Sequence, residues 1–189
     1  METSLSTTPP SADTTALIRQ ILDGDEQAKQ QLIALHQPTI LRFARHMMSN
    51  EHDAQDVAQD AMLKVLKNLH RYDDKWRFST WIIAITRNTC IDEFRRRRRL
   101  SSAEVPDVAD TAPTSLEQVS EQQRAKRLHT ALDKVPQLYR EVLVMYHFEH
   151  LKYQEIADVL DIPIGTVMNR IFRARKKLRS VYEEIDGGQ

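Results

Sequence analysis

The stretch from Tyr153 to Leu178 constrains the fold more than any other part of this chain. It reads YQEIADVLDIPIGTVMNRIFRARKKL, which is two helical patterns separated by Asp161-Ile162-Pro163. Proline has no amide hydrogen to donate to a continuing helix, so the first helix is expected to end before Pro163. A short helix, a tight turn and a second, basic helix together predict a helix-turn-helix.

The second of these helices is expected to have one buried and one exposed side. Its apolar residues recur at i, i+4, i+7 and i+11, so at roughly 100° per residue they share one stripe. They are Val167, Ile171, Ala174 and Leu178. A major groove admits one helix, and its base edges suit arginine, amides and apolar groups. The opposite, basic face therefore predicts contact with duplex DNA, although a merely solvated face is the alternative.

The charges of the chain are separated into blocks. Its 189 residues include 27 Lys and Arg and 27 Asp and Glu, which gives a formal net charge of zero. Residues 95–99 are consecutive arginines, whereas residues 101–123 contain acids and no cation. Only local charge steers a polyanion, so the neutral total does not exclude a nucleic-acid partner.

Composition favours an all-α protein. The chain has only four glycines, few aromatics and many strong helix formers in periodic segments. Its single cysteine, Cys90, excludes an internal disulfide and a cysteine-rich zinc site. No apolar run approaches bilayer length and no export signal opens the chain, so we expect a cytoplasmic protein without membrane insertion. No glycine-rich phosphate loop is present, and we expect no cofactor.

Two small helical domains joined by a flexible acidic linker are expected. Helix breaks within the first domain are predicted at Asp23-Gly24-Asp25 and before Pro38, which is expected to begin a new helix. The predicted boundaries are a disordered tail at 1–15, a helical domain at 16–99, the acidic linker at 100–122, a helix-turn-helix domain at 123–185 and a tail at 186–189.

Three aspartates mark the helix expected over residues 51–69. Asp53, Asp56 and Asp60 are spaced by three and four residues, which places them on one exposed face. Because like charges on one face repel each other, a basic partner would stabilise them. A hydrated acidic face near a helix N-terminus is an equal alternative.

Aromatic and basic residues alternate in the loop 69–79, LHRYDDKWRFS. This composition suits the stacking of exposed bases beside a phosphate backbone, although aromatics in a loop also fill cores. In the next helix, expected over residues 80–97, Asn88 and Asp92 lie one turn apart. They can contact base edges or bond each other, and the arginines that follow suit phosphates.

These segments together resemble the extracytoplasmic-function group of the sigma-70 family of bacterial RNA polymerase sigma factors. The resemblance covers about residues 16–179. Its motifs are DAQDVAQDAMLKV at 53–65, FSTWIIAITRNTCIDEFRRRRR at 78–99, VPQLYREVLVMYHFEHLKYQEIADVLDIPIGTV at 135–167 and NRIFRARKKL at 169–178. It implies a protein that is not an enzyme, binds core RNA polymerase and promoter DNA, and is held by an anti-sigma factor.

The resemblance also implies roles for individual positions. Asp53, Asp56 and Asp60 match the segment that docks on the polymerase clamp. The residues implied in reading and melting the -10 element are Tyr72, Trp76, Phe78, Trp81, Asn88, Asp92, Arg95 and Arg96. Those implied in reading the -35 duplex element are Thr166, Asn169, Arg170, Phe172, Arg173 and Lys176.

The chain departs from the family pattern at several positions. His150 and Asp161 stand where glycine is frequent, and both residue types tolerate unusual backbone angles better than most. Met168-Asn169 replaces a commoner basic-serine pair on the DNA-recognition helix, so the promoter sequence stays open.

Two other functions are compatible with parts of the sequence. A polymerase-independent helix-turn-helix regulator would use the same basic helix, but it leaves the acidic face and the aromatic loop unexplained. A metal-dependent phosphohydrolase is suggested by the adjacent pair His52-Asp53. Such a site needs further histidines, for which His36 and His46 are candidates, and a distant aspartate.

Overall fold

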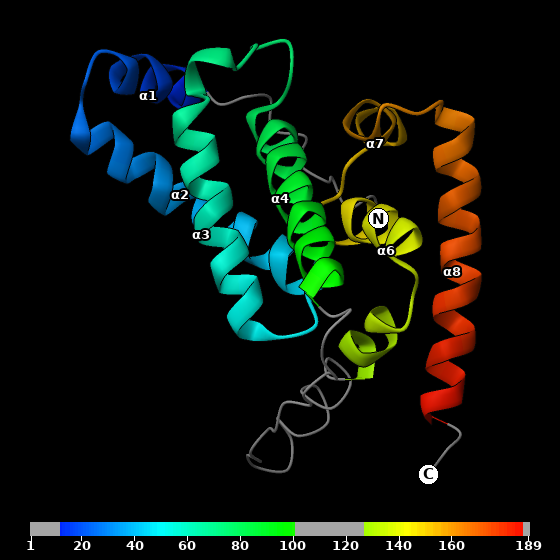
Figure 1. Ribbon diagram of the computed structural model, residues 1–189. Helices are drawn as coiled ribbons and strands as arrows, with labels where there is room; N and C mark the ends of the chain where they lie inside the picture. Colours follow the sequence, from blue (N-terminus) through cyan, green and yellow to red (C-terminus); the bar gives the residue numbers. More distant parts are fainter. Residues whose placement is uncertain (1–11, 101–126, 187–189) are drawn as a thin grey trace, which may run out of the picture.

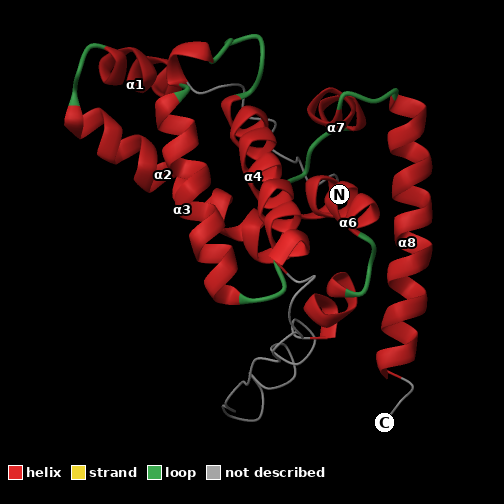
Figure 2. Cartoon of the chain, viewed as in Figure 1, coloured by secondary structure: helices red, strands yellow, loops and turns green. Residues whose placement is uncertain are grey.

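The computed structural model describes residues 12–100 and 127–186, and every regular element in them is a helix (Figures 1 and 2). The all-α prediction is confirmed for this part of the chain. In chain order the elements are α1 (Ala12–Leu22), α2 (Glu26–Met47), α3 (Glu51–Lys67), the 3₁₀ turn η1 (Leu69–Arg71), α4 (Phe78–Leu100), a helical segment at 127–133, α6 (Gln137–Leu143), the π-helical turn η2 (Val144–Phe148), α7 (Tyr153–Leu160) and α8 (Ile164–Asp186).

The first domain consists of α1 to α4, which pack around one apolar core. Local caps define where its helices begin. The Asp25 carboxylate accepts hydrogen bonds from the amides of Gln27 and Ala28, at 2.8 and 3.1 Å, and so caps α2. The Asn50 side chain accepts from the Asp53 amide at 2.8 Å and caps α3. These caps satisfy amides that have no partner within the helix.

Pro38 does not begin a helix, contrary to the prediction. It lies inside α2, which runs without interruption from Glu26 to Met47. An internal proline costs roughly 3 kcal/mol because it removes a backbone hydrogen bond. The same face of α2 buries Leu32 before the proline and Ile40 after it, and this burial offsets the cost. The predicted break after α1 is confirmed, with Gly24 at a φ of 96°.

The predicted disordered tail is too long at its C-terminal end. Residues 1–11 lie outside the described residues, but α1 already begins at Ala12 and Thr14 is buried. The predicted linker also falls almost entirely outside the described residues, as do the first four residues of the predicted second domain and positions 187–189.

The helix-turn-helix is confirmed. α7 ends at Leu160, and the residue that caps it, Asp161, has a left-handed backbone with a φ of 51°. The Ile162 amide then bonds the Ala157 carbonyl at 3.0 Å. His150 also has a positive φ, of 53°. α8 begins directly after Pro163 and buries three of the four predicted stripe residues fully and Leu178 partly.

The second domain packs directly on the first. α6 and α7 lie between α4 and α8 in Figure 1, and α2 contacts both α6 and η2. Buried residues of both domains form one continuous apolar cluster, and the His46 ring stacks on Phe148 with centroids 3.9 Å apart. Within the described residues, no helix combines the length and apolar character that crossing a membrane requires.

Candidate polymerase and nucleic-acid interfaces

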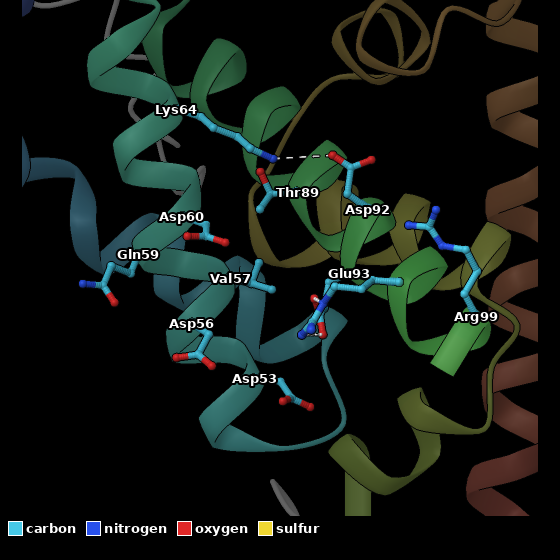
Figure 3. Close-up of a pocket in the computed structure, with 11 residues that line it drawn as sticks. Asp53, Asp56, Val57, Gln59, Asp60, Lys64, Thr89, Asp92, Glu93 and Arg99 are labelled. Carbon is cyan, nitrogen blue, oxygen red and sulfur yellow. Dashed lines mark hydrogen bonds and ion pairs between the residues drawn. The ribbon is translucent and has the colours of Figure 1, made fainter. Parts of the chain in front are cut away.

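α3 and α4 enclose an acidic cleft of about 490 Å³. Asp56 and Asp60 of α3 line one wall and Asp92 of α4 lines the other, while Lys64 reaches across to Asp92 at 3.4 Å (Figure 3). The cleft therefore brings together residues that were predicted to bind different partners. Asp56 and Asp60 were assigned to RNA polymerase, and Asp92 was assigned to the -10 element.

Asp53 does not share the exposed acidic face, which corrects the prediction of three exposed aspartates. Its carboxylate forms an ion pair with Arg97 and accepts a hydrogen bond from the Asn50 side chain. Asp53 is 8% exposed because α4 passes beside the beginning of α3 and brings Arg97 over it. The exposed acidic face thus consists of Asp56 and Asp60.

Gln59 is a residue of this surface that the sequence reasoning missed. It is exposed, and it lines both the acidic cleft and an apolar groove of about 500 Å³ between α2 and α3. Its position three residues after Asp56 and directly before Asp60 was the signal that could have identified it.

Three of the predicted aromatic residues come together at the start of α4. The Tyr72 ring lies 5.0 Å from Phe78 and 5.4 Å from Trp81, centroid to centroid. Phe78 is only 3% exposed, so it supports the cluster from the core. Trp76 lies at the surface, and its carbonyl accepts a hydrogen bond of 2.5 Å from the Tyr72 hydroxyl. Burial, followed by the charges of Asp74 and Asp73, raises the pKa of Tyr72.

Asn88 and Asp92 are both exposed on α4, one turn apart as predicted. Each bonds another residue: the Asn88 side-chain oxygen accepts from Arg87 at 3.1 Å, and Asp92 pairs with Lys64. Arg87 had no role in the sequence reasoning. Only its position next to Asn88 could have indicated one.

The basic run at the end of α4 is partly paired with acids. Arg96 forms two hydrogen bonds with Glu93, of 2.7 and 2.8 Å, and Arg97 bonds the same carboxylate at 2.7 Å. The hydrogen bond from Arg96, and then that from Arg97, lowers the pKa of Glu93. Arg95 is exposed and lines a separate hollow with Asp92. Arg95 and Arg96, both predicted phosphate contacts, therefore lie in different surroundings.

The outer face of α8 carries most of the predicted duplex contacts. Phe172 is 70% exposed, and Asn169, Arg173 and Lys176 are exposed around it. Thr166 is half-buried in the first turn of the helix, where its amide bonds the Pro163 carbonyl at 2.8 Å. Arg170 turns toward the protein instead and lies 3.6 Å from Glu141 of α6.

Within the described residues, the side chains named for the phosphohydrolase alternative do not come together as a metal site. The His52 side chain is 84% exposed and pairs with Asp56 in its own helix, at 3.2 Å. His36 packs its ring edge against Phe78, and His46 stacks on Phe148. Among residues 12–100 and 127–186, no group of three or more His, Cys, Asp or Glu side chains is placed to hold a metal ion.

A helix-turn-helix with an exposed basic face, packed on a helical domain with an acidic cleft, defines a two-domain DNA-binding protein. Residues 32–100 match the family Sigma-70 region 2, and residues 125–178 match Sigma-70, region 4. The chain belongs to the extracytoplasmic-function (ECF) group of sigma-70 family RNA polymerase sigma factors. It is a factor that directs RNA polymerase to promoters for transcription initiation, and the family consists of sigma factors and not of enzymes.

Relatives match along nearly the whole chain. The chain is 29% identical to the ECF RNA polymerase sigma factor SigW of Bacillus subtilis, over 89% of this chain and 96% of SigW. It is 31% identical to the ECF RNA polymerase sigma factor RpoE of Cereibacter sphaeroides, over 88% of this chain and 93% of that protein. The solved structure of CnrH in complex with the cytosolic domain of CnrY superimposes with a TM-score of 0.65 at 27% identity, covering 94% of this chain and 99% of that one.

Proposed function

We propose that this sigma factor uses three separate surfaces in promoter recognition. The outer face of α8 binds the -35 duplex element, α4 and the loop before it bind the -10 element as it opens, and the α3 acids bind the clamp of core RNA polymerase. One observation carries the proposal: the Phe172 ring is 70% exposed at the centre of a basic helical face. An apolar ring held in water there is stabilised when DNA covers it, for example through a thymine methyl group.

At the -35 element, the residues around Phe172 supply polar recognition. Arg173 can bond the two acceptors of a guanine edge, and Asn169 can bond an adenine edge. Lys176 lies farther along the same helix and the half-buried Thr166 lies in its first turn, and both suit backbone phosphates.

At the -10 element, the surface around α4 suits unpaired bases. Removing a base from the stack costs a few kcal/mol, which stacking and hydrogen bonds in the protein must offset. Trp76 and Trp81 supply rings at or near the surface, and Asn88 supplies an exposed amide. Opening is then driven by binding energy without nucleotide hydrolysis.

At the polymerase, Asp56 and Asp60 offer two exposed carboxylates to a basic partner surface, with the Gln59 amide beside them.

Arg95 and Arg96 belong to the DNA-binding part of the proposal. They lie at the far end of α4, where they suit the phosphate backbone that leads away from the opened -10 element.

An inhibitory protein partner and a cytoplasmic site of action complete the proposal. The CnrH structure is a complex with the cytosolic domain of CnrY, and the sigma factor RpoE of Bartonella quintana was solved in complex with the anti-sigma factor NepR. We expect an anti-sigma factor for this chain as well. Since its targets are RNA polymerase and promoter DNA, we expect it to act in the cytoplasm.

The experiment that tests this function is transcription in vitro with purified core RNA polymerase and genomic DNA. We expect defined start sites that are absent with core polymerase alone and weakened by Phe172→Ala. Failure of the unmodified chain to bind core polymerase, or to produce defined start sites, would overturn the proposal.

A further inference from the structure

Three exposed apolar side chains form a ridge along α8. Ile164, Met168 and Phe172 are spaced by four residues, and their exposed fractions are 43%, 53% and 70%. At roughly 100° per residue, each step of four residues turns by only about 40°, so the three side chains follow one another along the helix. They are called the apolar ridge below. A row of large apolar side chains in water is typical of a surface that another molecule covers.

The packing of α8 fixes the direction in which the apolar ridge points. α8 buries Val167, Ile171 and Ala174, and it contacts both α6 and α7. The Val167 amide bonds the Pro163 carbonyl at 3.2 Å, so the helix is formed from its first turn. The apolar ridge therefore lies on a helix that cannot rotate to bury it.

The exposed side of α8 is divided into an apolar and a polar part. Asn169 follows Met168 and Arg173 follows Phe172, and each is rotated by about 100° from the ridge residue before it. Both polar residues are exposed, as is Lys176. The major groove of DNA has the same two kinds of feature, because its bases present hydrogen-bonding edges and thymine methyl groups.

Charge indicates that the molecule that covers the apolar ridge is a polyanion. Residues 164–182 include six Lys and Arg and no Asp or Glu. Duplex DNA is attracted by such a charge, which an apolar partner surface would not require. In a helix-turn-helix, residues near the N-terminus of the second helix contact base edges. Met168 is the fifth residue of α8, so it belongs to this part of the helix.

The dimensions of the apolar ridge suit neighbouring base pairs. At 1.5 Å per residue, Met168 and Phe172 are about 6 Å apart along α8. Successive bases of one strand are about 3.4 Å apart along the duplex. The two side chains therefore suit methyl groups that are one or two base pairs apart. Methionine is flexible and polarizable, so it can adapt to a methyl group at either spacing.

We propose that Met168 and Phe172 of the apolar ridge read the methyl groups of thymines at two neighbouring positions of the -35 element. Met168 is then a specificity-determining residue, which selects A·T pairs through the methyl group, while Asn169 and Arg173 read hydrogen-bonding edges. This inference rests on the proposed function, because it takes the binding of α8 to the -35 duplex from there.

Replacement of thymine by uracil tests this reading, because uracil keeps the hydrogen-bonding edge and lacks only the methyl group. Holoenzyme is assembled from the full chain and core RNA polymerase, and mapped start sites locate the -35 element. Promoter duplexes then carry uracil at one A·T pair of the element at a time, and a titration measures their affinity for holoenzyme. The unmodified chain should lose about fourfold in affinity at each of two neighbouring positions, and less than twofold at the other thymines.

Two variants of Met168 show which side chain reads which methyl group. Met168→Gln keeps the length of the side chain but removes its apolar end, whereas Met168→Leu keeps an apolar end. Because Met168 is exposed, neither change should alter the fold. Met168→Gln should weaken binding of the thymine promoter about fourfold and abolish the response to uracil at one position only. Phe172→Ala should abolish the response at the other position, and Met168→Leu should keep both.

Leu22→Ala is the matched control for the loss of an exposed apolar side chain. Leu22 is 56% exposed at the end of α1, and α1 and α8 lie on opposite sides of the molecule in Figure 1. This variant should bind all of the promoters as the unmodified chain does.

Three results would overturn the reading of methyl groups. The first is an unchanged affinity with uracil at every thymine of the -35 element, and the second is an element without two A·T pairs within two base pairs of each other. The third is an equal response to uracil in the unmodified chain and in Met168→Gln, which would assign the ridge to a protein contact. All three leave the proposed function intact where holoenzyme produces defined start sites. Failure to bind core polymerase or to produce start sites would overturn the proposed function, and this reading with it.

Discussion

Arg140 of α6 donates a hydrogen bond of 2.8 Å to the backbone carbonyl of Met47, the last residue of α2. The last carbonyls of a helix have no partner within the helix, so this bond satisfies one of them from the other domain. The same guanidinium also donates to the carbonyls of Asp133 and Val135, at 2.6 and 3.4 Å. A single buried side chain therefore joins the end of α2 to the turn that precedes α6.

Arg140→Ala is expected to lower the free energy of unfolding by about 2 to 4 kcal/mol, because buried carbonyls lose a charged donor. Urea denaturation followed by circular dichroism measures the loss. Arg140→Lys keeps the charge but lacks the planar fork, so it should recover less than half of the stability. A loss below about 1 kcal/mol for the alanine variant would show that this contact contributes little.

Mutation of the three aspartates of α3 is expected to have two different effects, a loss of stability for Asp53 and a loss of polymerase binding for Asp56 and Asp60. Asp53→Ala removes the partner of Arg97 and should lower the free energy of unfolding by about 1 to 2 kcal/mol. Asp56→Ala and Asp60→Ala alter exposed carboxylates, so they should leave stability within about 0.5 kcal/mol and weaken binding to core polymerase. Melting curves and a core-binding titration measure the two effects. Equal polymerase affinity for all three variants and the unmodified chain would contradict the proposal that Asp56 and Asp60 bind core polymerase.

Local patterns predicted the parts of the fold that depend on neighbouring residues. The end of α7 and the start of α8 follow from Pro163 and from apolar spacing, and Asp161 adopts the left-handed backbone that its side chain tolerates. Pro38 was misread because the burial that compensates for it comes from other helices. A local rule cannot include that contribution.

The candidate site was predictable in composition but not in arrangement. Helical spacing correctly grouped Asp56 with Asp60, but it could not reveal that Arg97 covers Asp53. The interface between the domains left no sequence pattern at all, since Arg42 and Glu149, which form an ion pair across it, are 107 positions apart. Long-range ion pairs of this kind depend on how the helices pack.

His46 is expected to make the packed fold sensitive to acid. Burial first, and then the charges of His129 and Arg42, lowers the pKa of His46 to about 4 from its usual 6.5. The unfolded chain therefore binds a proton on this residue below pH 6.5 that the folded chain does not bind until about pH 4. Its contribution to stability is lost as the pH falls through this window, by about 1 to 2 kcal/mol at pH 5.

His46→Phe provides the matched variant for this effect, because it keeps a ring against Phe148 and removes the titrating group. Urea denaturation at pH 7 and pH 5 should show a smaller acid-induced loss in this variant than in the unmodified chain. The pKa of His129 is raised by its hydrogen bond to Asp133, so His129 has the opposite dependence and loses its contribution as the pH rises. An identical loss between pH 7 and 5 in both proteins would exclude His46 as the cause.

Asn88→Ala is expected to impair promoter opening without altering polymerase binding. Asn88 is exposed on α4 and is absent from the acidic face of α3, so the contact to the opened strand should be lost while the polymerase contact is kept. Permanganate reactivity of unpaired thymines measures opening, and a core-binding titration measures assembly. Gln154→Ala, an exposed amide on α7, serves as the control. If core affinity fell as much as opening did, the assigned role would be wrong.

Arg173→Ala tests whether α8 reads bases or only holds the backbone. Arg173 is exposed beside Phe172, and an arginine bonded to both acceptors of a guanine discriminates against other bases by about 1 to 3 kcal/mol. The variant should therefore lose affinity for duplexes that contain the -35 element by that amount, but much less for scrambled duplexes. Lys177→Ala is the comparison for a nonspecific contact, since an exposed lysine that contacts a phosphate should weaken both duplexes equally and reduce the salt dependence of binding. Equal losses on the two duplexes with Arg173→Ala would make Arg173 a phosphate contact as well.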